Sequence, residues 1–185
     1  IERPLLALLC DHFFSAGIDA IFGEGFATDE VYADYARIDR FFGAAVMGVP
    51  PRFLPGFVAS RDRLARTLGH RGPRYAPVLD ARDEVFGKHG IEPALSGRFD
   101  AGLLWASQAN TVVTAFWTVV YLLRNAQALT AIRAELHDVV GSATLASAEP
   151  LSRDALRRLV LLDSACSEGM RLAAGPMNGR HATED

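Results

Sequence analysis

The sequence is poor in cysteine and has no excess of basic charge. Its two cysteines, Cys10 and Cys166, lie far apart and form no C-x-x-C spacing, which argues against a zinc site or a redox pair. Free thiols in a reducing compartment are therefore expected. Nineteen Lys and Arg residues stand against 22 Asp and Glu residues, giving a formal net charge of −3. Nucleic-acid-binding proteins usually carry an excess of positive charge, which this sequence lacks. We therefore do not consider nucleic-acid binding further.

Familiar catalytic and metal-binding motifs are also missing. No G-x-S-x-G nucleophile turn and no Walker-type phosphate loop occurs, and Ser164 and Ser167 have no placed histidine that could activate them. The histidines form no H-E-x-x-H or other ligand spacing, so metal ligation is not indicated. They are His12, His70, His89, His137 and His181.

The sequence does contain a strong helical pattern. Half of its 185 residues are hydrophobic and 22% are charged, the balance of a folded globular protein with room for one domain and a real core. Apolar side chains recur at helical spacing, and no segment alternates convincingly as a strand. Helices are predicted at residues 4–22, 28–46, 58–68, 78–88, 100–124, 126–140 and 152–173, with connections at 69–77, 90–97 and 141–151.

The chain is organised around the stretch between Asp100 and Arg124, which contains no charged residue. Its length meets the criterion for a membrane span, about 20 mostly apolar residues. No second span and no basic flank before Asp100 accompany it. We therefore favour a long helix through the middle of a mostly helical, soluble domain. One side of this helix is polar, and we expect it to face a bound cofactor or substrate. That side carries Ser107, Asn110, Thr111, Thr114 and Thr118.

A proline-rich connection, VMGVPPRFLPGF, is unusually apolar. It places Phe53, Leu54 and Phe57 among prolines, where connections are normally polar. Three interpretations remain open. The segment touches a bilayer surface, caps the entrance to a cavity for an apolar ligand, or packs on its own domain.

The last predicted helix contains the pair Glu168 and Arg171. At this spacing such a pair is usually a surface ion pair that contributes about 0.2–0.5 kcal/mol. However, Glu168 shares a helical face with Leu161, Ala165 and Leu172. If that face is buried, the carboxylate is buried too and needs Arg171 as a permanent partner.

Three segments together resemble a known family. LLWASQANTVVTAFWTVVYLLRN, AQALTAIRAEL and LLDSACSEGMRLAAGPMNGR resemble, in order and spacing, the I-, J- and K-helices of a cytochrome P-450. The phrase WASQANT is similar to the branch that contains cholesterol and oxysterol 7-alpha-hydroxylases and prostacyclin synthase. The earlier stretch YARIDRFFGAAVMGVPPRFL resembles the hairpin that roofs the substrate channel in that branch.

The resemblance implies a mainly α fold. It corresponds to roughly the E to K helices of a cytochrome P-450, with minor β structure at the C-terminal end. Residues 1–185 are then one partial domain, truncated at both ends, without the membrane anchor and without the loop whose cysteine ligates the haem iron.

The resemblance also implies roles for individual residues around haem b. Ala106 and Ser107 correspond to the small residues where the helix passes over the haem. Asn110, followed by Thr111, stands where most members have the threonine of an acid–threonine pair that supplies protons during oxygen activation. An amide can donate and accept hydrogen bonds but cannot act as an acid. Arg180 corresponds to the arginine that binds a haem propionate.

Further expected roles concern the substrate and the structural pair. Trp105 is expected to line the substrate cavity, and Glu168 with Arg171 to form the structural pair beneath the haem. The residues that border the substrate near the haem are expected to be Ala173, Ala174, Pro176 and Met177.

The implied function is part of a haem-thiolate monooxygenase. It would hydroxylate a sterol or similar lipid with dioxygen and electrons from an NADPH-dependent reductase or a ferredoxin. Two alternatives remain: a haem-thiolate isomerase or dehydratase of an oxygenated lipid, and a truncated helical binding module without catalysis. The resemblance implies the endoplasmic reticulum membrane in a eukaryote and the cytoplasm in a bacterium. Because no cysteine of this chain has the ligand-loop context, the isolated 185 residues are expected to be inactive.

Overall fold

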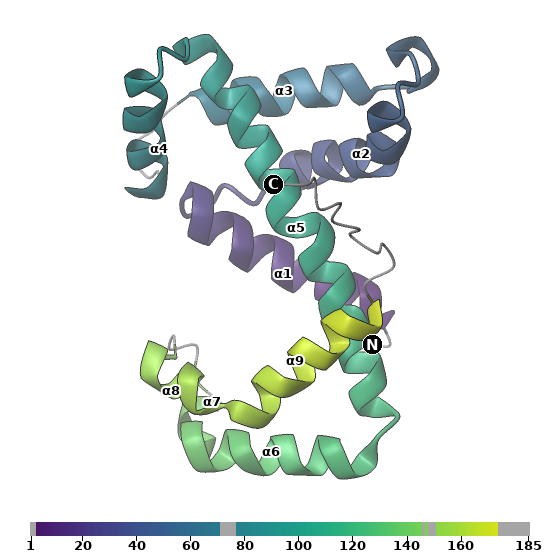
Figure 1. Ribbon diagram of the computed structural model, residues 1–185, viewed down its shortest axis with the longest axis vertical. Helices are drawn as coiled ribbons and strands as arrows, with labels where there is room; N and C mark the ends of the chain where they lie inside the picture. Colours follow the sequence, from purple (N-terminus) through teal and green to yellow (C-terminus); the bar gives the residue numbers. More distant parts are fainter. Residues whose placement is uncertain (1–2, 71–76, 146, 148–150, 174–185) are drawn as a thin grey trace, which may run out of the picture. The chain divides into compact units, whose positions relative to one another are not determined.

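The computed structural model describes residues 3–70, 77–145, 147 and 151–173, and the regular elements in this part of the chain are all helical (Figure 1). The chain divides into two compact units, Ile1–Val112 and Val113–Asp185, and the longest helix contributes to both. The prediction of a single partial domain stays a prediction. The minor β structure expected at the C-terminal end concerns residues outside the described ones.

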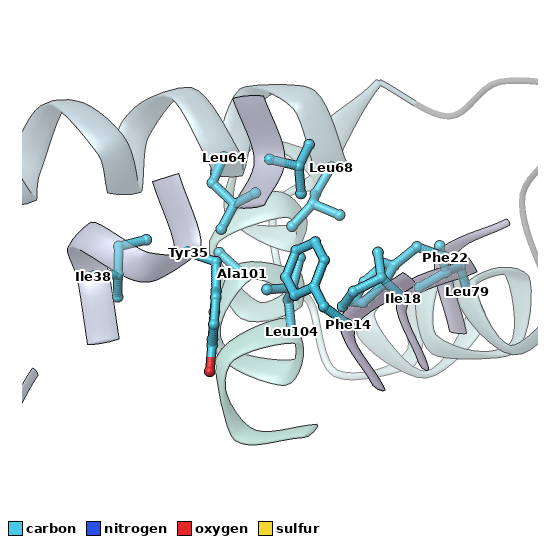
Figure 2. Packing of buried hydrophobic residues seen from close by; sticks show 11 residues of the cluster. Phe14, Ile18, Phe22, Tyr35, Ile38, Leu64, Leu68, Leu79, Ala101 and Leu104 are labelled. Carbon is cyan, nitrogen blue, oxygen red and sulfur yellow. The ribbon is translucent and has the colours of Figure 1, made fainter. Parts of the chain in front are cut away.

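The first unit is built from helices that surround a common apolar core. Figure 2 shows this core, to which α1, α2, α3, α4 and the first half of α5 all contribute buried side chains. Its largest fully buried members include Phe22, Ile18 and Leu104. The elements of this unit are α1 (Leu5–Phe22), α2 (Asp29–Val46), the 3-10 turn η1 (Pro51–Phe53), α3 (Phe57–Gly69), α4 (Pro77–Lys88) and α5 (Pro93–Leu123).

The turn between α1 and α2 is fixed by side-chain caps. Oδ1 of Asp19 accepts the backbone N–H groups of Phe26 and Ala27 at 3.0 and 2.9 Å. The hydroxyl of Thr28 then accepts the N–H of Val31 at 3.3 Å and starts α2. This confirms the helix start predicted from the sequence.

The candidate membrane span in the described residues is α1 and not the central helix. Only α1 meets the test of length and composition there, with 18 residues and a hydropathy of 1.6. Its side chains Phe14, Ile18 and Phe22 are buried in the core of the first unit. A core helix and a membrane span share this composition, so the finding is weak evidence for a membrane.

The central helix begins earlier than predicted. The connection expected at 90–97 ends at Glu92, and α5 starts at Pro93, because proline suits the first turn of a helix, where its missing N–H is not needed. Gly97 lies in the helix against α3: a Cβ there would be 2.0 Å from the carbonyl oxygen of Ala65. Asp100 is fully buried and bonded at 2.9 Å to Arg82 of α4, so it lies inside the helix rather than at its start.

The second unit contains the end of α5 and the helices that follow. Asn125 caps α6 by accepting the N–H of Ala128 at 3.0 Å. A short helix occupies part of the connection predicted at 141–151. The helix predicted at 152–173 is interrupted at Leu159, whose φ of −82° and ψ of 65° are not helical. The elements are α6 (Ala126–Val140), α7 (Ser142–Leu145), α8 (Arg153–Arg158) and α9 (Val160–Ala173).

The interruption at Leu159 has a cause on a neighbouring helix. The carboxylate of Glu135 in α6 accepts the backbone N–H groups of Leu161 and Leu162 at 2.7 and 3.0 Å. These are among the first N–H groups of α9, which have no partner within their own helix, and a carboxylate there also complements the helix dipole. Glu135 therefore gives α9 a separate start. The helices predicted at 4–22, 28–46, 58–68, 78–88 and 126–140 are confirmed to within two residues.

Candidate functional site

The candidate site is arranged around the middle of α5, which carries five of the residues singled out from the sequence: Trp105, Ala106, Ser107, Asn110 and Thr111. Trp105 faces α2, and Ser107 with Thr111 lines a cavity shared with α1. Ala106 and Asn110 lie on the exposed part of the same helix. The predicted residues of α5 therefore have three different surroundings: α2, the cavity shared with α1, and the exposed side of the helix.

Trp105 is held by two contacts from α2. Its indole Nε1–H donates a hydrogen bond to Oδ1 of Asp39 at 3.0 Å. Its ring stacks on Phe42, with ring centroids 3.5 Å apart and planes inclined by 19°. Nearby on α2, burial raises the pKa of Tyr35 well above its ordinary value, and the negative charge of Asp39 adds to the shift. The predicted cavity residue is thus part of an aromatic and charged cluster between α2 and α5.

The cavity between α1 and α5 has a volume of about 360 Å³. Hydroxyls in its wall are turned back onto their own helix. Ser107 donates to the carbonyl oxygen of Leu104 at 2.9 Å, and Thr111 donates to that of Ser107 at 2.8 Å. Their donor capacity is therefore used within α5. The lining residues are His12, Phe13, Ala16, Gly17, Ile21, Ser107, Gln108 and Thr111.

Gln108 is a buried polar residue that the sequence analysis did not single out. It is 2% exposed, and its Nε2 donates to the hydroxyl of Ser107 at 3.3 Å. Its Oε1 has no hydrogen-bond partner within the described residues. A buried acceptor without a partner costs about 1–3 kcal/mol. Gln108 therefore lowers the stability of the folded chain while lining the cavity.

The exposed side of α5 carries small side chains. Ala106 and Asn110 are exposed, and a Cβ placed on Gly102 would meet nothing within 4 Å. Asn110 does not line the cavity shared with α1, and its amide has no hydrogen bond to any of the described residues. A flat molecule could approach the helix closely along this side, with the amide of Asn110 free to bond to it.

The Glu168–Arg171 pair forms, but it is not buried. Two hydrogen bonds join Nε and Nη2 of Arg171 to the carboxylate of Glu168 at 2.7 and 2.6 Å. The hydrogen bond from Arg171 holds the pKa of Glu168 below its ordinary value. The prediction that Glu168 is buried with the neighbouring leucines is wrong: Glu168, Leu161 and Leu172 share a face, but this face is exposed.

The buried face of α9 is the adjacent one. Leu162, Ala165 and Ala173 are half-buried there, and Gly169 is buried. This set recurs every three or four residues, as one side of a helix does. Within the Glu168–Arg171 motif it is therefore Gly169, and not the charged pair, that packs against a neighbouring helix.

Several predicted residues lie outside the described part of the chain. The predicted propionate ligand Arg180 is among them. The predicted substrate-bordering residues Ala174, Pro176 and Met177 also lie outside the described residues. Ala173 is the last residue of α9 and is half-buried.

Neither cysteine lies in a loop of the kind expected for the haem ligand, because Cys10 is in α1 and Cys166 is in α9. Both are free thiols, as predicted. Burial raises the pKa of Tyr32, and a contact with Cys10 adds to this shift, which places that thiol against a phenol. Partial burial, followed by the charge of Asp163, raises the pKa of Cys166. A raised pKa favours the neutral thiol, and only the thiolate binds iron.

Three important residues were missed by sequence reasoning. Asp39 and Phe42 contact Trp105, although they precede it by 66 and 63 residues in the sequence. No local sequence pattern predicts a contact over such a separation. Gly169 did carry a signal, because an isolated glycine inside a helical pattern often marks close packing.

Comparison with known proteins gives a family and several relatives. The family described as Cytochrome P450 matches residues 101–185. The chain is 28% identical over 197 residues to the 5-beta-cholestane-3-alpha,7-alpha-diol 12-alpha-hydroxylase of Sus scrofa, covering 95% of this chain and 38% of that protein. It is 30% identical over 196 residues to Cytochrome P450 7A1 of Rattus norvegicus, covering 93% of this chain and 38% of that protein.

A third relative is the Prostacyclin synthase of Homo sapiens, 34% identical over 128 residues, covering 68% of this chain and 25% of that protein. The chain thus spans about 38% of the length of the Sus scrofa and Rattus norvegicus relatives. No solved structure matches it. The family match includes most of α5 and all of α9, and the similarity to the relatives extends over nearly the whole chain. The chain belongs to the cytochrome P450 family.

Proposed function

We propose that this chain is part of a haem-thiolate monooxygenase that hydroxylates a sterol or a similar lipid. The observation that carries the proposal is the exposed side of α5, where Gly102, Ala106 and Asn110 leave space for a flat group. One of the relatives, the 5-beta-cholestane-3-alpha,7-alpha-diol 12-alpha-hydroxylase, is by its name a hydroxylase of a sterol-type substrate. Dioxygen and electrons from an NADPH-dependent reductase or a ferredoxin would be the co-reactants.

The described residues fit one side of haem b. Ala106 would lie against the ring, because small side chains allow close approach of a helix to a planar molecule, whereas Ser107, also expected there, lines the cavity with α1. Arg180 would pair with a propionate. Neither Cys10 nor Cys166 fits the iron ligand, since each lies within a helix rather than a ligand loop, and burial raises the pKa of the Cys166 thiol. When bound through a thiolate, haem supplies the activation of dioxygen.

Asn110 and Thr111 would act by hydrogen bonding and not as acids. The amide of Asn110 is exposed and can both donate to and accept from a bound oxygen-containing group. The hydroxyl of Thr111 already donates to the carbonyl oxygen of Ser107 at 2.8 Å, which leaves its oxygen as an acceptor. Protons for the reaction would then be relayed through water held by these groups, without a carboxylic acid at this position.

The same feature favours one alternative function. An isomerase or dehydratase of an oxygenated lipid needs no external proton delivery, and the prostacyclin synthase relative is 34% identical over 128 residues. The amide of Asn110, which stands where most members have a threonine hydroxyl, is compatible both with this isomerase or dehydratase chemistry and with hydroxylation. The non-catalytic binding module is the remaining alternative and predicts no haem binding.

Trp105 and Phe42 would form part of the substrate wall. Their stacked rings present a broad apolar surface between α2 and α5, suited to the fused rings of a sterol. Ala173, Ala174, Pro176 and Met177 would complete the wall near the haem.

The tip between α2 and α3 supports contact with a membrane surface. Val46, Met47 and Phe53 are 70%, 88% and 62% exposed there. The guanidinium of Arg52 lies 4.8 Å from the centre of the Phe53 ring, so a positive charge adjoins the apolar tip. Leu54 is buried, so this part of the segment packs on its own domain. We place the protein at the endoplasmic reticulum membrane in a eukaryote and in the cytoplasm in a bacterium.

The proposal is tested with the native protein that contains this chain. It is supplied with cholesterol and dioxygen, and products are analysed with the reductase and NADPH present or omitted. A hydroxylated sterol that forms only with the reductase supports the monooxygenase. Rearrangement of a lipid peroxide without the reductase favours the isomerase, and absence of haem from the purified protein contradicts both.

A further inference from the structure

Trp105 is fixed in two independent ways by one helix. The hydrogen bond from its Nε1–H to Asp39, at 3.0 Å, holds the edge of the indole. The stacking on Phe42, with centroids 3.5 Å apart, holds its plane. Asp39 and Phe42 are three positions apart on α2, so they present their side chains to the same neighbour. Together they leave the indole little rotational freedom.

The helix that holds Trp105 is itself anchored. Tyr35 and Ile38 of α2 are buried in the core of the first unit. Asp34, also buried, accepts hydrogen bonds from Nε and Nη2 of Arg63 in α3 at 3.1 and 2.5 Å. Asp39 follows Ile38 directly, so it stands at the border between this packed core and solvent. The acceptor therefore has a fixed position.

An indole has a single hydrogen-bond donor, and Asp39 takes it. A bonded N–H is no longer available to a hydroxyl or ketone of a ligand unless the ligand displaces a carboxylate. Trp105 can then offer only its ring surface. In a cavity, such a surface favours hydrocarbon and penalises a polar group that loses its water without replacement.

We propose that Asp39 is a positioning residue that makes Trp105 an apolar wall of the substrate cavity and thereby selects the hydrocarbon part of the substrate at that point. This rests on the proposed function, in which Trp105 lines that cavity. Asp39 itself acts through Trp105 and does not touch the substrate.

The first experiment measures the indole directly, without any ligand. Trp117→Phe leaves Trp105 as the one tryptophan of the chain. In that background, Asp39→Leu removes the acceptor, whereas Asp39→Asn keeps a carbonyl oxygen at the same place. Hydrogen exchange of the indole N–H is followed by ¹⁵N–¹H spectroscopy, and Asp80→Leu, an exposed aspartate of α4, is the matched control.

We expect Asp39→Leu to accelerate exchange of the Trp105 N–H about tenfold, the effect of losing a hydrogen bond to a charged group. Asp39→Asn should retain most of the protection of the Trp105 indole N–H from hydrogen exchange. Asp80→Leu should retain all of this protection. Equal exchange in Asp39→Leu and the parent chain would overturn the proposal, as would a loss in Asp39→Asn as large as in Asp39→Leu. Circular dichroism of each variant checks that the helices remain.

The second experiment measures selection, with cholesterol and 25-hydroxycholesterol as probes and quenching of Trp105 fluorescence as the readout. Asp39→Leu should weaken cholesterol binding about fivefold to tenfold and reduce the preference between the two sterols, with rescue by Asp39→Asn. Unchanged affinities and preference in Asp39→Leu would overturn the proposed selection. Failure of the parent chain to bind either sterol would count against the proposed function, and the exchange result would still decide whether Asp39 positions Trp105.

Discussion

Thr118 of α5 and Gly169 of α9 lie in direct contact. A Cβ added to Gly169 would be 1.9 Å from Oγ1 of Thr118 and 3.2 Å from its Cα. Both residues are buried, and the threonine hydroxyl donates to the carbonyl oxygen of Thr114 at 2.8 Å. The two helices of the second unit therefore meet at the glycine that lies between Glu168 and Arg171.

The first prediction concerns this contact. Gly169→Ala introduces a methyl group where no space exists, so α5 and α9 must separate. We expect a loss of about 1–3 kcal/mol in the free energy of unfolding, the usual effect of overpacking. Urea unfolding followed by circular dichroism measures it.

The matched control is the same substitution at Gly87 in α4. A Cβ there would meet nothing within 4 Å, so Gly87→Ala should leave stability unchanged or raise it by up to about 1 kcal/mol, because alanine favours the helix. If Gly169→Ala behaves like Gly87→Ala, the close contact between Thr118 and Gly169 is wrong.

The second prediction concerns the acid stability of the Glu168–Arg171 pair. The hydrogen bond from Arg171 lowers the pKa of Glu168 from its ordinary value of 4.5. The stabilisation from this pair is therefore present above pH 4.5 and is lost as the pH falls through the lowered value of the folded state. Glu168→Gln should unfold slightly more easily than the parent chain at pH 7 and equally easily at strongly acidic pH.

The measurement is the urea midpoint of both proteins across this pH range. The difference at neutral pH should be small, because both side chains are more than half exposed and solvent screens the pair. A large loss at neutral pH would show that the pair is buried in solution, as the sequence pattern suggested and the structure does not.

The third prediction concerns the apolar tip between α2 and α3. Replacing Met47 and Phe53 together by serine should weaken binding to vesicles of phosphatidylcholine and phosphatidylserine by tenfold or more. Each side chain would otherwise transfer part of the roughly 1.5–3 kcal/mol of its burial energy into the bilayer surface. Sedimentation with the vesicles gives the bound fraction.

The control replaces Val78 and Val85 of α4, which are 46% and 49% exposed and lie away from the tip in sequence. The double serine variant there should bind the vesicles as the parent chain does. Equal loss in both double variants would point to general hydrophobicity and contradict a role for the tip.

The fourth prediction concerns the cysteines. The 185-residue chain, supplied with haemin, reduced and exposed to carbon monoxide, should give no thiolate-type Soret band, because Cys10 and Cys166 both lie within helices and burial raises the pKa of the Cys166 thiol. A thiolate-type band that disappears in Cys10→Ser or in Cys166→Ser would show that one of them ligates the iron.

Local signals in the sequence were sufficient to predict most helices. Thr28 followed by two acidic residues predicts the start of α2, and its hydroxyl makes the expected cap. Features that depend on a distant partner could not be predicted in this way. The separate start of α9 depends on the carboxylate of Glu135 in α6, and the close packing of Gly97 in α5 against Ala65 in α3 likewise joins residues far apart in the sequence.

In the candidate site, too, features that depend on a distant partner could not be predicted from local sequence. The polar side of α5, predicted from helical geometry to face one ligand, does not face one place in the structure: Ser107 and Thr111 line the cavity with α1, Asn110 is exposed, and Thr118 packs against Gly169. Which face of α9 is buried could not be decided from periodicity, because Leu161 and Leu172 are apolar and yet exposed. The partners of Trp105 come from α2, and their pairing depends on how two helices pack.

We propose that the side of α5 carrying Asn110 faces haem b, and the substitution Asn110→His in the native haem protein is the sharpest test of this proposal. If Asn110 faces the haem, an imidazole at that position would ligate the iron and convert the ferric electron paramagnetic resonance spectrum to a low-spin form, with loss of carbon monoxide binding after reduction. Val85→His on α4 should leave the spectrum unchanged. A spectrum of Asn110→His identical to that of the parent protein would contradict the account.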